Sequence, residues 1–246
     1  MIGLLTRAKH NFSTVSIEWV EEYSEIFSRA FERRLPLDLP AGSESTVTLE
    51  AQRTGPAGMP PSRHECRAWW RRPCNWRDER RWDGGALAIS VSDGATASAY
   101  VSSLHTLYTN QRTQRLVTRI RSLLQPQMGY QLPTVENRLQ NIPLLDPSFL
   151  ASWELATLGE LKYLDRSCFR IGAVRTNATP GPVPWHWVDE YEVLVDQEVG
   201  VLLRYAGIVD GEQAASLSVR SVHFNDPIPD EVFSYEPPEG TKTIWV

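Results

Sequence analysis

Cysteine is scarce in this sequence, with three residues in 246, Cys66, Cys74 and Cys168. An odd number excludes a framework in which every cysteine is paired, and few thiols fit a reducing compartment. Cys66 and Cys74 could still meet if the chain reverses near Pro73, so a disulfide between them stays open. A zinc site from His64, Cys66 and Cys74 is disfavoured, because the spacing differs from a zinc finger and no fourth ligand is evident.

Long apolar runs are also lacking. No stretch approaches the roughly 18 apolar residues that cross a bilayer as a helix. Residues 1–5 are too short for the apolar part of a signal peptide, and Arg7, Lys9 and His10 follow at once. The sequence therefore predicts no membrane span and, as written, a cytoplasmic chain.

Motifs for catalysis are missing as well. The sequence has no Gly-x-Ser-x-Gly, no Walker loop and no dinucleotide-binding glycine motif. Carboxylates cluster beside turns, where Asp and Glu usually serve capping and solvation. These carboxylates are Asp189, Glu190, Glu192 and Asp196, then Asp226, Asp230 and Glu231. His186, between Trp185 and Trp187, is interpreted as a hydrogen-bonded histidine rather than a base. We therefore predict no enzyme, no cofactor and no metal.

Net positive charge is absent too: the formal net charge is −5, which gives no bulk attraction to nucleic acid. One segment is locally basic and aromatic, with Arg63, Arg67, Arg71, Arg72, Arg77, Arg80 and Arg81 among Trp69, Trp70, Trp76 and Trp82. Such interleaving can bind single-stranded nucleic acid by stacking and phosphate contact. The favoured interpretation is a β-hairpin with one apolar and one Arg-rich face, because successive strand residues point to opposite sides.

Strand patterns dominate what is present. Residues 191–195, 201–205 and 217–224 predict three antiparallel strands, joined by turns at Asp196–Gly200 and Asp210–Gly211. Hairpins are expected at 65–72 with 75–82 and at 86–92 with 97–101. A strand is expected from 15 to 22 and a helix from 24 to 34. The remaining expected elements are helices at 2–12, 111–124 and from Asp146–Pro147, and strands at 46–51, 156–161, 168–175 and 185–189. The two meanders are expected to join in one sheet.

Several of these pieces occur in an order that resembles the bacterial lipoprotein-carrier (LolA/LolB/RseB-like) superfamily. The C-terminal pieces are Val195-Asp196, the return strand Gly200 to Arg204, the segment Asn225 to Phe233, and Pro237 to Gly240. The upstream pieces are Trp69 to Pro73, Trp76-Arg77, and Ser92-Asp93-Gly94. The resemblance covers about two thirds of the chain. Members of the superfamily are usually exported, which departs from the cytoplasmic expectation above.

The resemblance implies one α+β domain over residues 1–246. Its core is a large curved, mostly antiparallel sheet, a half-open barrel, with a few helices on the concave face. It further implies non-catalytic binding of an apolar ligand, either an acyl chain, a lipid or a lipid-modified protein, in the cavity. We expect Trp69, Trp76, Phe149, Leu150 and Trp153 to contact the ligand, with the last three on a helix over the cavity mouth. An ordinary filled core, a protein-interaction or sensor module using the same groove, and a hydrolase remain alternatives.

Overall fold

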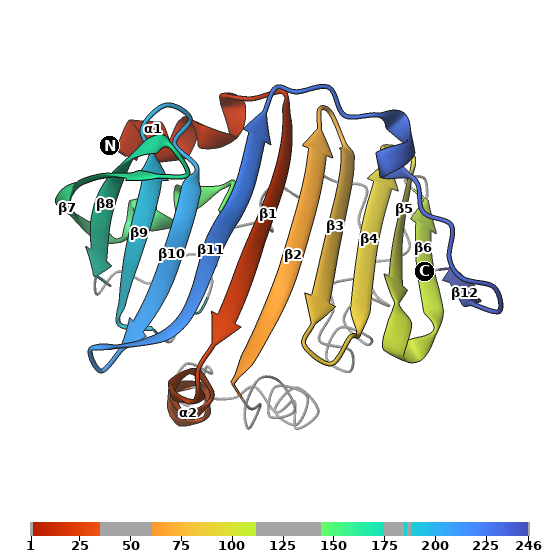
Figure 1. Ribbon diagram of the computed structural model, residues 1–246, viewed down its shortest axis with the longest axis horizontal. Coiled ribbons are helices and arrows are strands. Elements are labelled where there is room, and N and C mark those ends of the chain that lie inside the picture. The colour runs from red at the N-terminus through yellow and green to blue at the C-terminus, as the bar shows by residue number, and fades with distance from the viewer. Residues whose placement is uncertain (1, 35–60, 112–143, 175–184, 186–187, 246) are drawn as a thin grey trace, which may run out of the picture.

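A computed structural model describes residues 2–34, 61–111, 144–174, 185 and 188–245, and the twelve strands of these residues form one sheet (Figure 1). The order across the sheet is β12-β6-β5-β4-β3-β2-β1-β11-β10-β9-β8-β7. The strands are β1 (Thr14–Tyr23), β2 (Ser62–Arg71), β3 (Asn75–Trp82), β4 (Leu87–Asp93), β5 (Thr96–Val101), β6 (Thr106–Gln111), β7 (Glu154–Tyr163), β8 (Arg166–Val174), β9 (Glu190–Asp196), β10 (Leu202–Val209), β11 (Glu212–Phe224) and β12 (Lys242–Trp245). The described helices are α1 (Ile2–Arg7) and α2 (Glu25–Arg34), with the 3-10 segments η1 (Ala8–His10), η3 (Ser102–Leu104), η6 (Pro147–Ser152) and η7 (Asp230–Phe233).

The sheet consists of two meanders that meet at β1. Strands β2 to β6 follow one another antiparallel on one side, and β7 to β11 do so on the other. β1 pairs antiparallel with both β2 and β11, so the first strand of the chain lies in the middle. The sheet is open, with β12 and β7 at its two edges. The expected large, curved, mostly antiparallel sheet with few helices is confirmed.

β1 shows why this sequence forms a strand. Val15, Ile17 and Trp19 are buried and alternate with partly exposed Ser16 and Glu18, the period of a half-buried strand. α2 then begins at Glu25, where the apolar spacing changes to that of a helix. The expected change from strand to helix is therefore confirmed to within one or two residues.

The expected turns also form. Asp196 Oδ1 accepts hydrogen bonds from the backbone N–H groups of Glu198 and Val199, at 2.9 and 2.7 Å. Gly200 follows with a φ of 86°, and a Cβ there would lie 2.6 Å from the carbonyl oxygen of Leu4. Glycine at position 200 therefore meets two needs, a left-handed backbone and close contact with α1.

Four expectations differ from the structure or fall outside it. Residues 185–189 were expected in a strand, but Trp185 has a φ of 50° in a turn and β9 begins at Glu190. The helix expected from Asp146 is the short 3-10 segment η6. The strand expected at 46–51 and most of the helix expected at 111–124 lie outside the described residues.

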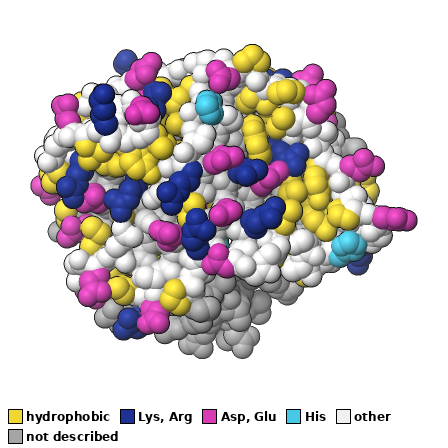
Figure 2. All heavy atoms as spheres, viewed as in Figure 1, with side chains coloured by type: hydrophobic (Ala, Val, Ile, Leu, Met, Phe, Trp, Pro, Cys, Tyr) yellow, Lys and Arg dark blue, Asp and Glu magenta, His cyan; other side chains and the backbone are white. Residues whose placement is uncertain are grey.

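The two faces of the sheet differ in chemistry. We call the face that carries Ile17 and Trp19 the inner face, because η6 and the core pack against it. The opposite, outer face shows basic and acidic side chains interleaved across the strands (Figure 2). Among its ion pairs are Arg67 with Glu18 at 3.2 Å and Arg170 with Glu192 at 2.7 Å. The outer face is thus a solvated face whose charges largely neutralise one another.

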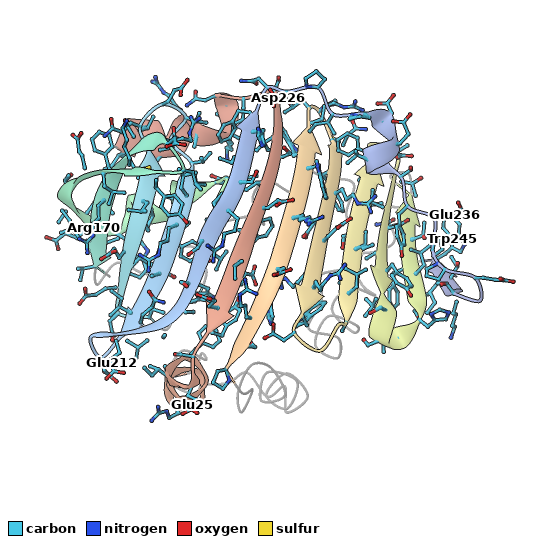
Figure 3. The ribbon with its side chains drawn as sticks, in the orientation of Figure 1. Glu25, Arg170, Glu212, Asp226, Glu236 and Trp245 are labelled. Atoms are coloured by element: carbon cyan, nitrogen blue, oxygen red, sulfur yellow. The ribbon has the colours of Figure 1, made fainter. Side chains whose placement is uncertain are left out.

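The C-terminal segment crosses the outer face. It leaves β11 and passes over β3 and β4 as η7, where the Arg71 guanidinium lies 4.7 Å from the centre of the Phe233 ring. It then pairs β12 in parallel with β6. Figure 3 shows Trp245 and Glu236 at that edge, with Arg170 at the opposite end of the sheet. This segment accounts for the basic-aromatic cluster in part, since its residues cover Arg71 and Arg77.

Candidate functional site

The candidate site is built on the inner face, where the strand register sets the neighbours. Trp19 of β1 lies opposite Cys66 of β2, and Cys66 lies opposite Arg80 of β3. One step along, Glu21 lies opposite His64 and His64 lies opposite Trp82. These rows bring residues from three strands together because paired residues in a sheet share a face. The result is a mixed aromatic and charged patch on the inner face.

Aromatic rings form a continuous row along this face. The row runs through Trp153, Tyr191, Tyr205, Trp185, Tyr23, His64 and Trp82, with ring centres 4.7 to 5.9 Å apart from one ring to the next. It crosses from η6 over β9, β10 and β1 to β3. Aromatic pairs at such distances attract beyond the burial of their area. We call this set the aromatic row.

A buried carboxylate stands beside the aromatic row. Glu21 is 3% exposed, and its Oε1 accepts hydrogen bonds from Trp19 Nε1 at 3.1 Å and from Arg80 Nη2 at 2.9 Å. Its Oε2 accepts from the Tyr23 hydroxyl at 3.0 Å, and His64 Nδ1 lies 3.5 Å away. A buried carboxylate needs such partners, because an unpaired one would cost several kcal/mol.

The charge of this cluster is fixed. Burial opposes the ionised form of Glu21, but the positive charge of Arg80 and the surrounding donors outweigh it and lower the pKa of Glu21 to about 2. Burial likewise opposes the charge of Arg80, whereas the Glu21 carboxylate raises the pKa of that guanidinium. Burial, with Glu21 nearby, raises the pKa of the Tyr23 hydroxyl. At neutral pH the cluster therefore holds an ion pair beside a neutral phenol.

Among the described residues, the inner face is partly accessible at β3 and β4, and also at β7, where Leu155 and Thr157 are not buried. Inward residues of β9 to β11 near the aromatic row are buried, as are His64, Cys66, Ala68 and Trp70 of β2. By contrast, five inward residues of β3 and β4 are partly exposed: Asp78, Arg80, Trp82, Ala88 and Ser90. The side chain of Arg80 is 41% exposed even though it holds the buried Glu21. We call these five residues the β3–β4 window.

The structure distributes the five expected ligand-contacting residues over both faces. Trp69 lies on the outer face, where Arg77 stacks over its ring at 5.9 Å, and Trp76 is buried on the inner face. Leu150 and Trp153 are buried, and Phe149 is partly buried against Tyr191. The inner face thus carries four of the five. Their contact with a ligand stays a prediction.

The residues that sequence patterns missed are Glu21, His64, Arg80 and Trp82. Arg80 and Trp82 appeared only as members of a basic and aromatic run, His64 only as a disfavoured zinc ligand, and Glu21 was not singled out. The signal that would have found them is alternation: β1, β2 and β3 each place one of these residues in line with buried apolar ones. Their partners lie far along the chain, with Arg80 59 residues from Glu21.

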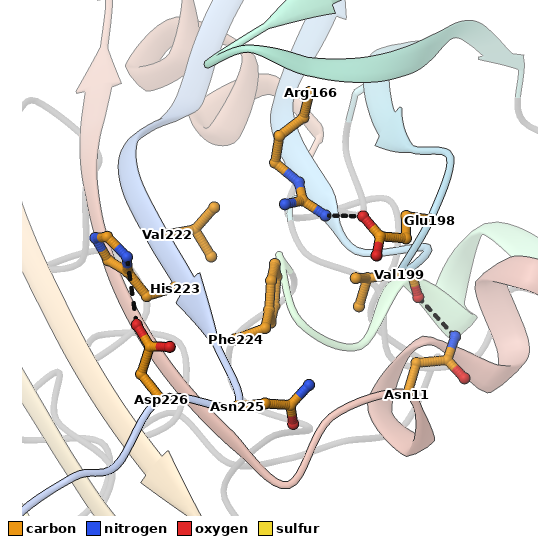
Figure 4. Close-up of a pocket in the computed structure, with 9 residues that line it drawn as sticks. All are labelled: Asn11, Arg166, Glu198, Val199, Val222, His223, Phe224, Asn225 and Asp226. Atoms are coloured by element: carbon orange, nitrogen blue, oxygen red, sulfur yellow. Dashed lines mark hydrogen bonds and ion pairs between the residues drawn. The ribbon is translucent and has the colours of Figure 1, made fainter.

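A second depression lies at the end of β11, beside the turn between β9 and β10 (Figure 4). It has a volume of about 540 Å³ and is lined by polar residues, including Arg166, Glu198, His223 and Asp226. Arg166 is hydrogen-bonded to Glu198 at 3.0 Å and to the buried Asp196. These ion pairs hold the turn beside Gly200, at the rim of the depression.

One arrangement at this rim resembles a hydrolytic triad. His223 Nε2 lies 3.3 Å from Ser221 Oγ, and Nδ1 lies 3.6 Å from Asp226 Oδ2. The side chains of His223 and Asp226 are 61% and 68% exposed, so water competes for every hydrogen bond. A triad needs a shielded base and oriented donors for the oxyanion. His223 and Asp226, which Figure 4 shows side by side, are too exposed to meet the first requirement.

Metal and disulfide chemistry can be assessed for the described part of the chain. Cys66, Cys74 and Cys168 are all free thiols, and Cys66 and Cys168 are buried. Burial raises the pKa of the Cys66 thiol. Within residues that the structure describes, no group of three or more His, Cys, Asp or Glu could hold a metal ion. Among these same residues, no helix has the length and apolar character needed to cross a membrane.

No protein-family model and no curated protein sequence matches the chain. Solved structures are similar over almost its whole length. An uncharacterized conserved protein from Thermus thermophilus is 10% identical, with 99% of this chain and 98% of that chain covered and a TM-score of 0.49. A chain in the complex structure of Pseudomonas aeruginosa MucA/MucB is 15% identical, with 95% of this chain and 59% of that chain covered and a TM-score of 0.44. The Mycobacterium tuberculosis lipoprotein LppX is 10% identical, with 93% of this chain and 94% of that chain covered and a TM-score of 0.40. At these identities the likeness carries no conclusion about ligand or partner.

Proposed function

We propose that the chain binds an apolar ligand, an acyl chain of a lipid or of a lipid-modified protein, on its inner face. The observation that carries this proposal is that the aromatic row runs unbroken from the core at η6 to the accessible β3–β4 window. An apolar wall that reaches an opening is what an acyl chain needs, and each buried CH₂ contributes about 0.8 kcal/mol.

The test is a titration with 1-N-phenylnaphthylamine, an uncharged probe that fluoresces in apolar sites. We expect saturable binding, and native mass spectrometry of freshly purified protein is expected to retain a lipid-sized mass. Trp82→Ala in the window should weaken probe binding about tenfold, whereas Trp69→Ala on the outer face should leave it unchanged. Absence of any probe binding by the parent protein would refute the proposal. If Trp69→Ala lost probe binding and Trp82→Ala kept it, the binding site would lie on the outer face instead.

We also propose that binding is not followed by catalysis. Ser221, His223 and Asp226 are the nearest approach to a catalytic arrangement in the described residues, and His223 and Asp226 line the depression at the end of β11 rather than the window. A panel of acyl esters is expected to give no turnover. Turnover that disappears in Ser221→Ala and is retained in Ser218→Ala, a serine of the same strand, would contradict this.

A second candidate is binding of an extended protein segment. β7 is an edge strand, and Leu158 and Leu161 on it are 54% and 38% exposed. Free backbone groups and exposed leucines at an edge suit addition of a strand from a partner. A displayed peptide library selected on the protein tests this. Peptides that lose binding to Leu158→Lys and keep it on Trp82→Ala would support the second candidate over the first.

A further inference from the structure

We propose that the Arg80 guanidinium binds the anionic end, a carboxylate or a phosphate, of an amphiphilic ligand whose chain lies along the aromatic row. This inference rests on the proposed function and assigns the ligand its polar end and its orientation. The chain would extend from the β3–β4 window toward η6, with the charged end at the opening.

The Arg80 guanidinium is hydrogen-bonded to Glu21, and its side chain is partly exposed. Its Nη2 donates to Glu21 at 2.9 Å, on the side of β1. A guanidinium has five N–H donors in a fixed fork, so its contacts with Glu21 and with the Cys66 thiol leave others for further acceptors. The 41% exposure of the side chain shows that this remaining surface is reachable. Glu21 therefore orients a cation toward the window instead of hiding it.

We place the oxyanion on the β4 side of Arg80, away from Glu21. The residue opposite Arg80 on β4 is Ala88, and both are partly exposed. A small side chain at this position leaves room beside the guanidinium. Ser90, the next inward residue of β4, adds a hydroxyl within the same window. A carboxylate or phosphate over Ala88 would meet donors from both strands.

The other groups near Arg80 limit the ligand to one anionic group at this place. Cys66 faces Arg80 from β2 as a buried neutral thiol, because burial raises its pKa. Asp78 lies two residues along β3 on the same face, and its charge acts on the Arg80 guanidinium. Glu21 is already paired. The site thus favours a single anionic end next to Arg80, with the apolar part directed away from Asp78.

The experiment measures displacement of 1-N-phenylnaphthylamine by three ligands with the same twelve-carbon chain: laurate, dodecyl phosphate and dodecanol, below their micelle concentrations. The parent protein is expected to prefer at least one anionic ligand over dodecanol by about tenfold or more, the effect of one charge-assisted hydrogen bond. The first two ligands separate carboxylate from phosphate recognition. Arg81→Gln, one residue along β3 on the outer face, serves as the matched control and should behave like the parent.

Arg80→Gln is expected to lose the preference while still binding the probe and dodecanol. Because this change leaves Glu21 buried without its cation, the double variant Glu21→Gln with Arg80→Gln removes both charges and is measured beside it. Arg80→Lys should retain part of the preference. Equal affinity of the parent for all three ligands, or an undiminished preference in the double variant, overturns the inference while the proposed function stands. Failure of the parent to bind the probe overturns both.

Discussion

Replacing Glu21 by glutamine tests how the inner face tolerates a buried charge. The amide keeps the size of the side chain and removes its charge, so Arg80 loses its ion-pair partner at 2.9 Å. The pKa of Glu21 is lowered from 4.5 to about 2 in the folded chain. That difference corresponds to about 3 kcal/mol of folding free energy at neutral pH, at about 1.4 kcal/mol per pKa unit. We expect Glu21→Gln to lower the free energy of unfolding by about 3 kcal/mol at pH 7.

The sign of the pH dependence follows from the same pKa. A carboxyl with a lower pKa in the folded state stabilises the fold fully above its unfolded value, near 4.5, and this contribution is lost as the pH falls toward 2. The free energy of unfolding of the parent should therefore fall as the pH drops from 4.5 toward 2. Glu21→Gln has no carboxylate to protonate at this position, so its free energy of unfolding should lack this decrease. The difference between them should shrink from about 3 kcal/mol at pH 7 toward zero near pH 2.

Urea unfolding followed by tryptophan fluorescence at pH 7, 5, 4 and 3 measures both quantities. Glu22→Gln is the matched control, since Glu22 is the next residue of β1, is exposed on the outer face, and has a loose 3.9 Å ion pair with Arg63. Its cost should stay below about 1 kcal/mol. If Glu21→Gln and Glu22→Gln cost the same, or the parent and Glu21→Gln curves run parallel from pH 7 to 3, the argument for a buried ion pair is wrong.

Three further changes test the fold around the site. Gly200→Val should lower the free energy of unfolding by more than about 1 kcal/mol, because it forces a left-handed φ and a Cβ 2.6 Å from the Leu4 carbonyl; an unchanged melting temperature would contradict this. Leu150→Ala should cost about 2 to 5 kcal/mol in urea unfolding, whereas Leu158→Ala, 54% exposed, should stay within about 0.5. Asp196→Asn should lower the melting temperature by weakening the turn that it caps, and equal melting of variant and parent would remove its capping role.

Local patterns predicted the strands near the C-terminus well. Tyr191, Val193 and Val195 lie at every second position of β9 and are buried, and Asp210-Gly211 takes the positive φ values of a tight hairpin turn. Such signals span a few residues, so they need no knowledge of the rest of the chain. The same holds for the change from β1 to α2.

The choice of face was harder to predict. Trp69 and Trp70 are adjacent, so alternation sends them to opposite sides without saying which side is covered. The structure buries Trp70 against Phe12 from the N-terminal segment and leaves Trp69 under Arg77. That outcome depends on packing partners distant in sequence.

Glu21 illustrates a stronger limit. In the sequence it stands beside Glu22, and nothing local tells the buried glutamate from the exposed one. Only the pairing of β1 with β2, and of β2 with β3, brings Arg80 to Glu21 across His64 and Cys66. A buried charge is stable only with such a partner, so its burial follows from tertiary structure and from no local pattern.

The central place of β1 has a consequence for how the chain is made. Val15 pairs with Phe224, so β1 is synthesised long before β11, the strand that covers its second edge. Until then β2 to β6 can assemble on one side of β1, while its other edge offers unpaired backbone groups to other strands. A chain that ends before residue 212 would lack β11, so the meander of β7 to β10 would not be joined to β1.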